Sequence, residues 1–138
     1  MIGYVMVGTN HLDKAIIFYD DVLKELNLKR VETDPEYAAY APVDNPTEIE
    51  FYVTKPFNKE KATNGNGTQV SFVTTSRQIV DKFHETGLNA GGKSEGSGGE
   101  RPSNSGIYYS YIRDLDGNKI CAFTNNKTWC HTKLSKKN

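Results

Sequence analysis

The sequence has few cysteines, no excess of charge and no long apolar run. Its 138 residues include two cysteines, too few for a disulfide framework or a cysteine zinc site. Lys and Arg number 17, as do Asp and Glu, so no net charge would recruit nucleic acid or an anionic membrane. The apolar runs are short, and "MIGYVMVG" at the start is too short and too weakly basic for a signal peptide. We therefore expect a soluble, cytoplasmic protein without nucleic-acid or membrane partners.

Familiar catalytic and ion-binding patterns are also missing. The glycine of "DLDGN" directly follows the second Asp, too early for a calcium loop, and "GSGGE" does not open a helix as a phosphate loop does. No Ser-His-Asp or Cys-His arrangement is indicated, because the three histidines are isolated from one another: His11, His84 and His131.

What is present is one pattern written twice, which predicts a single α+β domain over 1–138. The first module, about 1–55, has a strand "IGYVMVG", an amphipathic helix "LDKAIIFYDDVLKEL" that Asn10 can cap, and three further strands. The second module, about 66–125, repeats strand and helix in "QVSFVTT" and "SRQIVDKFHETGL", with Ser76 as cap, and 126–138 is a polar tail. Two βαβββ modules predict a cup of two curved mixed sheets, with one helix behind each half.

The second module is less clearly marked after its helix. The stretch "NAGGKSEGSGGERPSNSG" has low strand and helix propensity, so it is either a linker or a mobile cover over a site. "YIRDLDGNKICAF" follows as a hairpin, for which Asp116-Gly117 is a strong two-residue turn signal.

Side-chain alternation predicts which face of each strand is buried. Phe51 and Val53 would pack under a helix, so Glu50 and Tyr52 point the other way. The same argument turns several further side chains away from the helices, toward solvent or a shared concavity: Tyr4, Gln69 and Cys121. Tyr4 and Gln69 are equivalent under the repeat, which indicates a site on a pseudo-twofold axis.

The segments "IGYVMVGTNHLDKAIIFYDDVL", "NGTQVSFVT" and "YIRDLDGNKICAF" together resemble the vicinal oxygen chelate superfamily, which includes glyoxalase I, bleomycin-resistance proteins and extradiol dioxygenases. The resemblance spans about residues 2–124, and "RDLDGNKI" is its most specific part. It implies two βαβββ modules that form a cup, in which the enzymes hold a divalent metal at four strand positions. Those positions correspond here to Tyr4, Glu50, Gln69 and Cys121.

The residues at these positions form an incomplete metal-ligand set. Metal-holding members would have His or Glu where this chain has Tyr4, Gln69 and Cys121, and only Glu50 is a strong ligand for a hard cation. We therefore expect no cofactor; a divalent metal, if present, would use Glu50 and Gln69. Cys121 is interpreted as a small apolar residue on the cup floor.

The remaining candidates suit an organic ligand. Tyrosines give flat apolar area and one polar handle, so Tyr4, Tyr52 and Tyr108 are candidate binding residues, and Arg101 could clamp a carboxylate or phosphate. The favoured function is a cup that binds a small organic molecule and lacks a complete metal-ligand set; one version of it is a binding protein without catalysis. The alternative is a metal-dependent lactoylglutathione-lyase-like or dioxygenase enzyme with Glu50 as base or ligand. Exposed strand edges further predict a homodimer.

Overall fold

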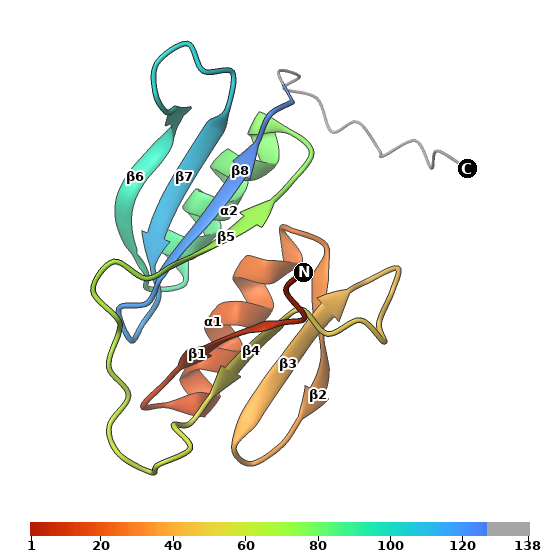
Figure 1. The fold of residues 1–138 in the computed structure, drawn as a ribbon, viewed down its shortest axis with the longest axis vertical. Helices are drawn as coiled ribbons and strands as arrows, with labels where there is room; N and C mark the ends of the chain where they lie inside the picture. Colours follow the sequence, from red (N-terminus) through yellow and green to blue (C-terminus); the bar gives the residue numbers. More distant parts are fainter. Residues whose placement is uncertain (127–138) are drawn as a thin grey trace.

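The computed structural model describes residues 1–126, which fold as two halves of the same plan (Figure 1). The elements of the first half are β1 (Val5–Gly8), α1 (Leu12–Lys24), β2 (Leu28–Thr33), β3 (Tyr37–Pro42) and β4 (Phe51–Thr54). Those of the second half are β5 (Gln69–Val73), α2 (Arg77–Asn89), β6 (Lys93–Glu100), β7 (Tyr108–Arg113) and β8 (Lys119–Thr124). The predicted βαβββ pattern is confirmed in both halves.

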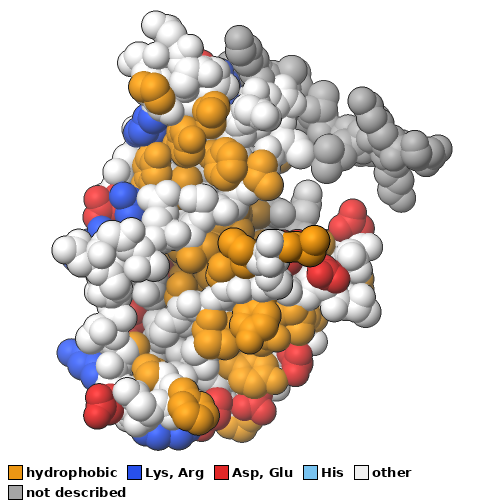
Figure 2. All heavy atoms as spheres, in the orientation of Figure 1, with side chains coloured by type: hydrophobic (Ala, Val, Ile, Leu, Met, Phe, Trp, Pro, Cys, Tyr) orange, Lys and Arg blue, Asp and Glu red, His pale blue; other side chains and the backbone are white. Residues whose placement is uncertain are grey.

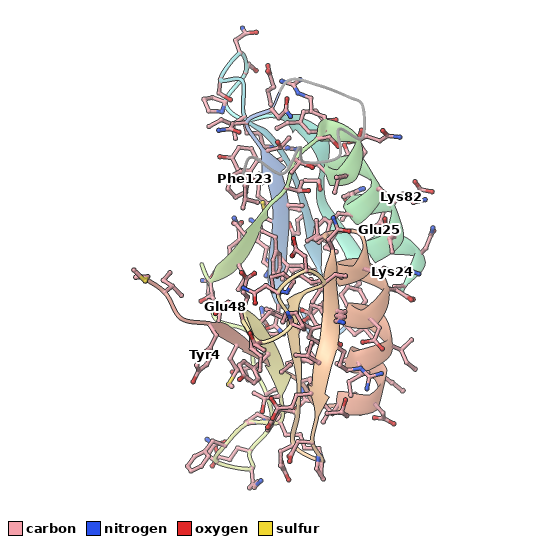
Figure 3. The ribbon with its side chains drawn as sticks, turned by 90° about the vertical axis from the view of Figure 1, so that its right-hand side faces the viewer. Tyr4, Lys24, Glu25, Glu48, Lys82 and Phe123 are labelled. Atoms are coloured by element: carbon pink, nitrogen blue, oxygen red, sulfur yellow. The ribbon has the colours of Figure 1, made fainter. Side chains whose placement is uncertain are left out.

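Each half forms one four-stranded mixed sheet with one helix behind it. The strand orders are β1-β4-β3-β2 and β5-β8-β7-β6. The first strand of each half runs parallel to the last, and the other neighbours are antiparallel. Figure 3 shows Lys24 and Lys82 on the helix side and Tyr4 and Phe123 on the opposite side. The predicted α+β class, with two modules that form a cup, is therefore correct.

The internal repeat holds through the helix of each half. Adding 65 to the bounds of α1 gives those of α2, and β2 and β6 begin 65 residues apart. The offset then grows, because the connection 101–107 between β6 and β7 is longer than the turn between β2 and β3. Both halves thus share one spacing of elements up to the loop that carries Arg101.

The core lies between each sheet and its helix, as alternation predicted. Phe51 and Val53 of β4 are fully buried, as are Ile120 and Ala122 of β8. The helices contribute further large buried side chains to this core: Phe18, Tyr19, Val22, Leu23, Val80 and Phe83. Burial of these apolar groups is the main term that favours folding, at roughly 25 cal/mol per Å² removed from water.

Two local predictions about capping and turns need correction. Ser76 does cap α2, accepting a hydrogen bond from the backbone N–H of Ile79 at 3.2 Å, but α1 has His11 at its N-cap position without a side-chain cap. Asn10 instead accepts a hydrogen bond from the backbone N–H of Ala62 and donates one to its carbonyl. Its amide is thus committed to holding the connection between the halves.

The connection between β7 and β8 is longer than a two-residue hairpin turn. It runs from Asp114 to Asn118, and only Gly117 has a positive φ, at 88°. The Asp114 carboxylate accepts hydrogen bonds from the backbone N–H groups of Asp116 and Asn118, both at 2.9 Å. A side chain that organises the loop from within therefore replaces the predicted type of turn.

Part of the glycine-rich stretch is a strand, so that part is neither the linker nor the mobile cover that the sequence suggested. Lys93–Glu100 forms β6 and pairs antiparallel with β7, with register shifts around Gly96. Tertiary pairing overrides the poor strand propensity of these residues. None of the helices in the described part of the chain is long and apolar enough to cross a membrane. The tail with Cys130 and His131 lies outside the described residues.

Candidate functional site: a cleft between the two halves

A cleft of about 730 Å³ lies where the edge strand β5 faces the first half. Its lining is mainly apolar and includes Ile2, Val5, Leu28, Val43, Val70 and Phe72. Polar residues join them: Asn27, Asp44, Glu50, Gln69, Ser71, Thr74 and Thr75. Among residues 1–126, β5 pairs on one side only, with β8, so its other edge is free to form this wall. An apolar cleft with few polar groups is the usual form of a small-molecule site.

Two of the predicted site residues, Glu50 and Gln69, meet at this cleft. Glu50 directly precedes β4, and its backbone is fixed by bonds to Val5 and Tyr40 at 3.1 and 3.0 Å, while its side chain is exposed. The Gln69 amide donates to Ser71 Oγ at 2.9 Å. Within residues 1–126 no group of three or more His, Cys, Asp or Glu side chains is placed to hold a metal ion.

Cys121 lies one strand away from the cleft wall, directly beside Ser71. It shares with Lys119 and Phe123 the face of β8 opposite the core, as the alternation predicted, yet its side chain is fully buried. This burial raises the pKa of the Cys121 thiol. A thiol with a raised pKa carries little thiolate near neutral pH, which fits its interpretation as a small apolar residue.

An aromatic row covers the outer face of the second sheet. The ring centroids of Tyr109 and Tyr111 are 5.8 Å apart with planes at 6°, and Phe123 stacks on Tyr109 at 5.5 Å. Two cations lie against the Tyr111 ring: Lys119 Nζ is 5.0 Å and Arg101 Cζ is 5.1 Å from its centroid. Apolar side chains gather over both sheets on the face shown in Figure 2.

The structure buries Tyr108, the candidate binding residue on β7, away from the outer face of the sheet. Tyr108 lies on the helix side of the sheet, where its hydroxyl donates to Asp81 Oδ1 of α2 at 2.8 Å. Burial, with Asp81 as the next cause, raises the pKa of Tyr108 to about 12. Ile112 must be buried, and alternation from it already places Tyr108 inward and Tyr109 and Tyr111 outward. That signal was available in "YYSYIR".

Tyr4 and Tyr52 form a separate aromatic cluster on the outer face of the first sheet. Their ring centroids are 4.9 Å apart in an edge-on arrangement, and Tyr37 approaches Tyr52 at 5.6 Å. Tyr4 is 58% exposed and Tyr52 is half-buried. Neither residue lines the cleft itself, so the predicted set is spread over four places: the cleft, the outer face of each sheet and, for Tyr108, the helix side of the second sheet.

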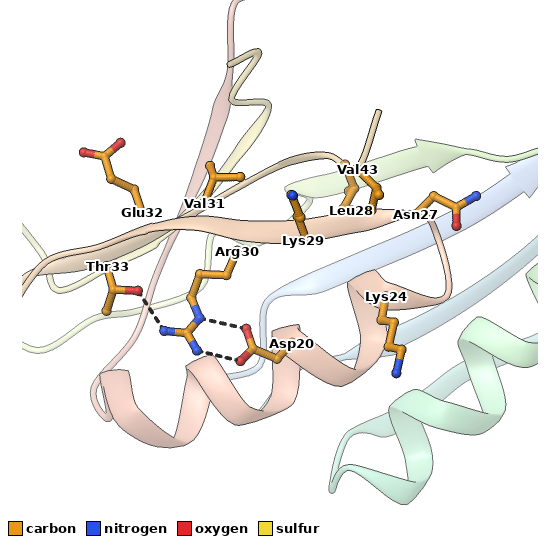
Figure 4. Close-up of a pocket in the computed structure, with 10 residues that line it drawn as sticks. All are labelled: Asp20, Lys24, Asn27, Leu28, Lys29, Arg30, Val31, Glu32, Thr33 and Val43. Atoms are coloured by element: carbon orange, nitrogen blue, oxygen red, sulfur yellow. Dashed lines mark hydrogen bonds and ion pairs between the residues drawn. The ribbon is translucent and has the colours of Figure 1, made fainter. Parts of the chain in front are cut away.

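A second hollow of about 780 Å³, between β2 and α1, is a poorer candidate (Figure 4). The Arg30 guanidinium, which lines this hollow, donates to both carboxylate oxygens of Asp20 at 3.1 Å and to Thr33 Oγ1 at 2.7 Å. These polar groups satisfy one another, and the hollow follows an edge strand with exposed charges, a common means of discouraging strand pairing.

Comparison with known proteins gives a consistent result. The family model described as Glyoxalase/Bleomycin resistance protein/Dioxygenase superfamily matches residues 1–122. A glyoxalase/bleomycin resistance protein from Albidiferax ferrireducens T118 is 36% identical, with a TM-score of 0.80 over 90% of this chain and 98% of its own.

Two more distant structures share the fold. A glyoxalase-related enzyme from Fulvimarina pelagi is 17% identical, with a TM-score of 0.70 over 90% of this chain and 87% of its own. A lactoylglutathione lyase from Agrobacterium tumefaciens is 19% identical, with a TM-score of 0.64 over 90% and 92%. No curated protein matches the chain.

Proposed function

Because the chain belongs to the Glyoxalase/Bleomycin resistance protein/Dioxygenase superfamily, we propose that it binds a small organic molecule in the cleft between its halves, without a resident metal. The observation that carries this proposal is the cleft itself, whose apolar walls meet a few polar groups at Glu50, Gln69 and Ser71. Such a lining buries an organic body and orients it by a small number of hydrogen bonds.

The chemistry of the polar groups favours binding over metal catalysis. Among the four positions that the resemblance identifies, Glu50 alone is a strong ligand for a hard cation, and a neutral amide such as Gln69 binds divalent ions weakly. Cys121 is fully buried on the strand behind the cleft wall and is not part of the cleft lining. The competing function is a metal-dependent lyase or dioxygenase that uses Glu50 and Gln69. This alternative is based on the position of both residues in one cleft.

A metal analysis and a ligand screen together test the proposal. We expect protein purified without chelator to hold no stoichiometric divalent metal, and chelator to leave its melting temperature unchanged. One equivalent of zinc, nickel, iron or manganese, lost in Glu50→Ala, would establish the metal enzyme instead.

The ligand screen uses a fragment library and thermal shift, with Ser71→Trp to fill the cleft. Ser71 is exposed on the cleft wall, so the added indole should abolish the shifts without unfolding the protein. Lys29→Trp, on the exposed edge strand β2 and outside the cleft, should leave the shifts intact. Shifts that survive in Ser71→Trp would place binding elsewhere.

A further inference from the structure

We infer that the ligand of this site carries an anionic group, held by Lys119 and Arg101 over the Tyr111 ring, and that its class is therefore a planar organic carboxylate. This inference rests on the proposed function, since it names the chemistry of the molecule that the cleft and the adjoining sheet face would bind. Four features of the second sheet carry it.

The first feature is that Lys119 holds a charge without an ionic partner in the part of the chain that the structure describes. Its Nζ lies 5.0 Å from the Tyr111 centroid, and no carboxylate within the described residues approaches it to ion-pair distance. The nearby acid, Glu95, is already paired with Arg113 at 2.8 Å. Three cations thus share one carboxylate on this face, which leaves a local excess of positive charge.

The second feature is that the Arg101 charge is fixed in place by the backbone. Its guanidinium donates to the carbonyls of Ser97 at 2.8 Å, Tyr109 at 2.9 Å and Gly99 at 3.3 Å. These bonds satisfy donors but do not neutralise the charge. A cation that is already immobile loses little side-chain entropy when an anion binds beside it.

The third feature is the glycine-rich sequence of β6, which makes room for this arrangement. A Cβ on Gly96 would lie 2.8 Å from Arg101 Nη2 and 3.3 Å from the Tyr111 ring. Gly96 also has a φ of 152°, which other residues rarely adopt. The missing side chain therefore lets the guanidinium fold back over β6 onto Tyr111.

The fourth feature is that this face continues from the cleft. Gln69 of the cleft wall is the direct neighbour of Lys119 on β8, and Ser71 is the neighbour of Cys121, which in turn pairs with Tyr111. Neighbouring strands lie about 4.8 Å apart, so the body of a ligand in the cleft can extend to Lys119 and Tyr111. The stacked rings of Tyr109 and Phe123 offer further flat apolar area.

The test compares 2-naphthoate with 2-naphthamide, two planar probes of equal shape that differ in charge. In calorimetric titrations of the full chain we expect naphthoate to bind about ten- to a hundredfold more tightly, the range of one hydrogen bond to a charged group. Lys119→Met should remove this preference while leaving naphthamide affinity unchanged.

Lys24→Met, on the helix side, is the matched control (Figure 3). Arg101→Lys keeps the charge but loses the fork of donors, so it should weaken the preference less than Lys119→Met.

The outcomes separate this inference from the proposed function. Equal binding of both probes, blocked by Ser71→Trp, would overturn the anion inference and leave the cleft as a site for neutral ligands. A naphthoate preference that Lys119→Met does not change would also overturn it. Binding of neither probe would overturn it as well, and the fragment screen then decides on the cleft. Preference that falls with added salt and is lost in Lys119→Met supports it.

Discussion

Tyr19 of α1 donates a hydrogen bond from its hydroxyl to Oδ2 of Asp114 in the β7–β8 loop, so one buried pair joins the two halves. Asp116 of the same loop accepts hydrogen bonds from Thr9 Oγ1 at 2.6 Å and from the backbone N–H of Asn10 at 2.8 Å. The two aspartates of "RDLDGNKI", the most specific part of the resemblance, therefore hold the halves together.

Loss of the Tyr19 hydroxyl should weaken this joint. In Tyr19→Phe the Asp114 carboxylate, which is almost fully buried, loses one of its donors. We expect the free energy of unfolding to fall by about 1.5–3 kcal/mol, the usual value for a hydrogen bond to a charged group, as measured by urea denaturation. Tyr37→Phe is the matched control, because its hydroxyl donates to the exposed Glu32 and should cost less than about 1 kcal/mol. Equal losses would contradict a special role for the buried pair.

Gly96→Ala should disturb both the sheet and the Arg101 position. The added Cβ meets Arg101 Nη2 at 2.8 Å, and the backbone has a positive φ, so we expect a loss of stability of about 1–3 kcal/mol. Gly99→Ala on the same strand would place its Cβ at an ordinary 3.6 Å and should change stability by no more than about 0.5 kcal/mol. If both variants unfold at the same urea concentration, the packing explanation for the glycine-rich strand fails.

The contribution of Tyr108 to stability should depend on pH in the alkaline range. Its folded pKa of about 12 lies above its ordinary value of 10.0, so the folded state holds the proton more tightly than the unfolded state. The resulting stabilisation is fully present below pH 10 and disappears as pH rises through 12. The stability difference between the wild type and Tyr108→Phe, followed by urea denaturation, should therefore shrink over this window. A constant difference would mean that Tyr108 titrates normally.

Cys121 should react slowly with thiol reagents. In a Cys130→Ser variant it is the single thiol, fully buried and with a pKa raised by that burial. We expect native protein to label far more slowly than protein in denaturant, and the rate to keep rising above pH 8.5, the region where an ordinary thiol of pKa about 8.5 levels off. Rapid labelling at neutral pH would show an accessible, reactive cysteine and contradict its interpretation as an apolar residue.

The uncovered sheet faces lead us to expect a homodimer. Tyr4 and Met6 are 58% and 50% exposed on the face of the first sheet, a location where large apolar side chains usually mark an interface. Light scattering at micromolar concentration should give twice the chain mass, and Met6→Glu should shift the protein toward monomer. Ile17→Glu, at an exposed apolar position on α1, serves as control. A monomeric mass for the wild type would refute the expectation.

The sequence by itself determined the two-module plan and the inward and outward faces of the clear strands. Periodicity of 2 and 3.6 is a local property, so Phe51 and Val53 could be placed in the core, and Glu50 and Cys121 on the opposite face, from neighbours along the chain. The cap at Ser76 was likewise local. The expectation of an incomplete metal-ligand set rested on the resemblance and on the identity of four residues, and it stays a prediction.

Only the tertiary structure decided what β6 is and what Asn10, Asp114 and Arg101 do. Each of these depends on a partner far away in sequence: β7 pairs with β6, Ala62 engages Asn10, and Tyr19 reaches Asp114 across 95 residues. A glycine-rich segment has no alternation of apolar and polar side chains that would reveal a strand. Its pairing is decided instead by the neighbouring strand β7, and the Arg101 guanidinium occupies the space above Gly96. Local periodicity carries no information on contacts between residues that are distant in sequence. Such contacts place the positive charges of Arg101 and Lys119 beside the cleft.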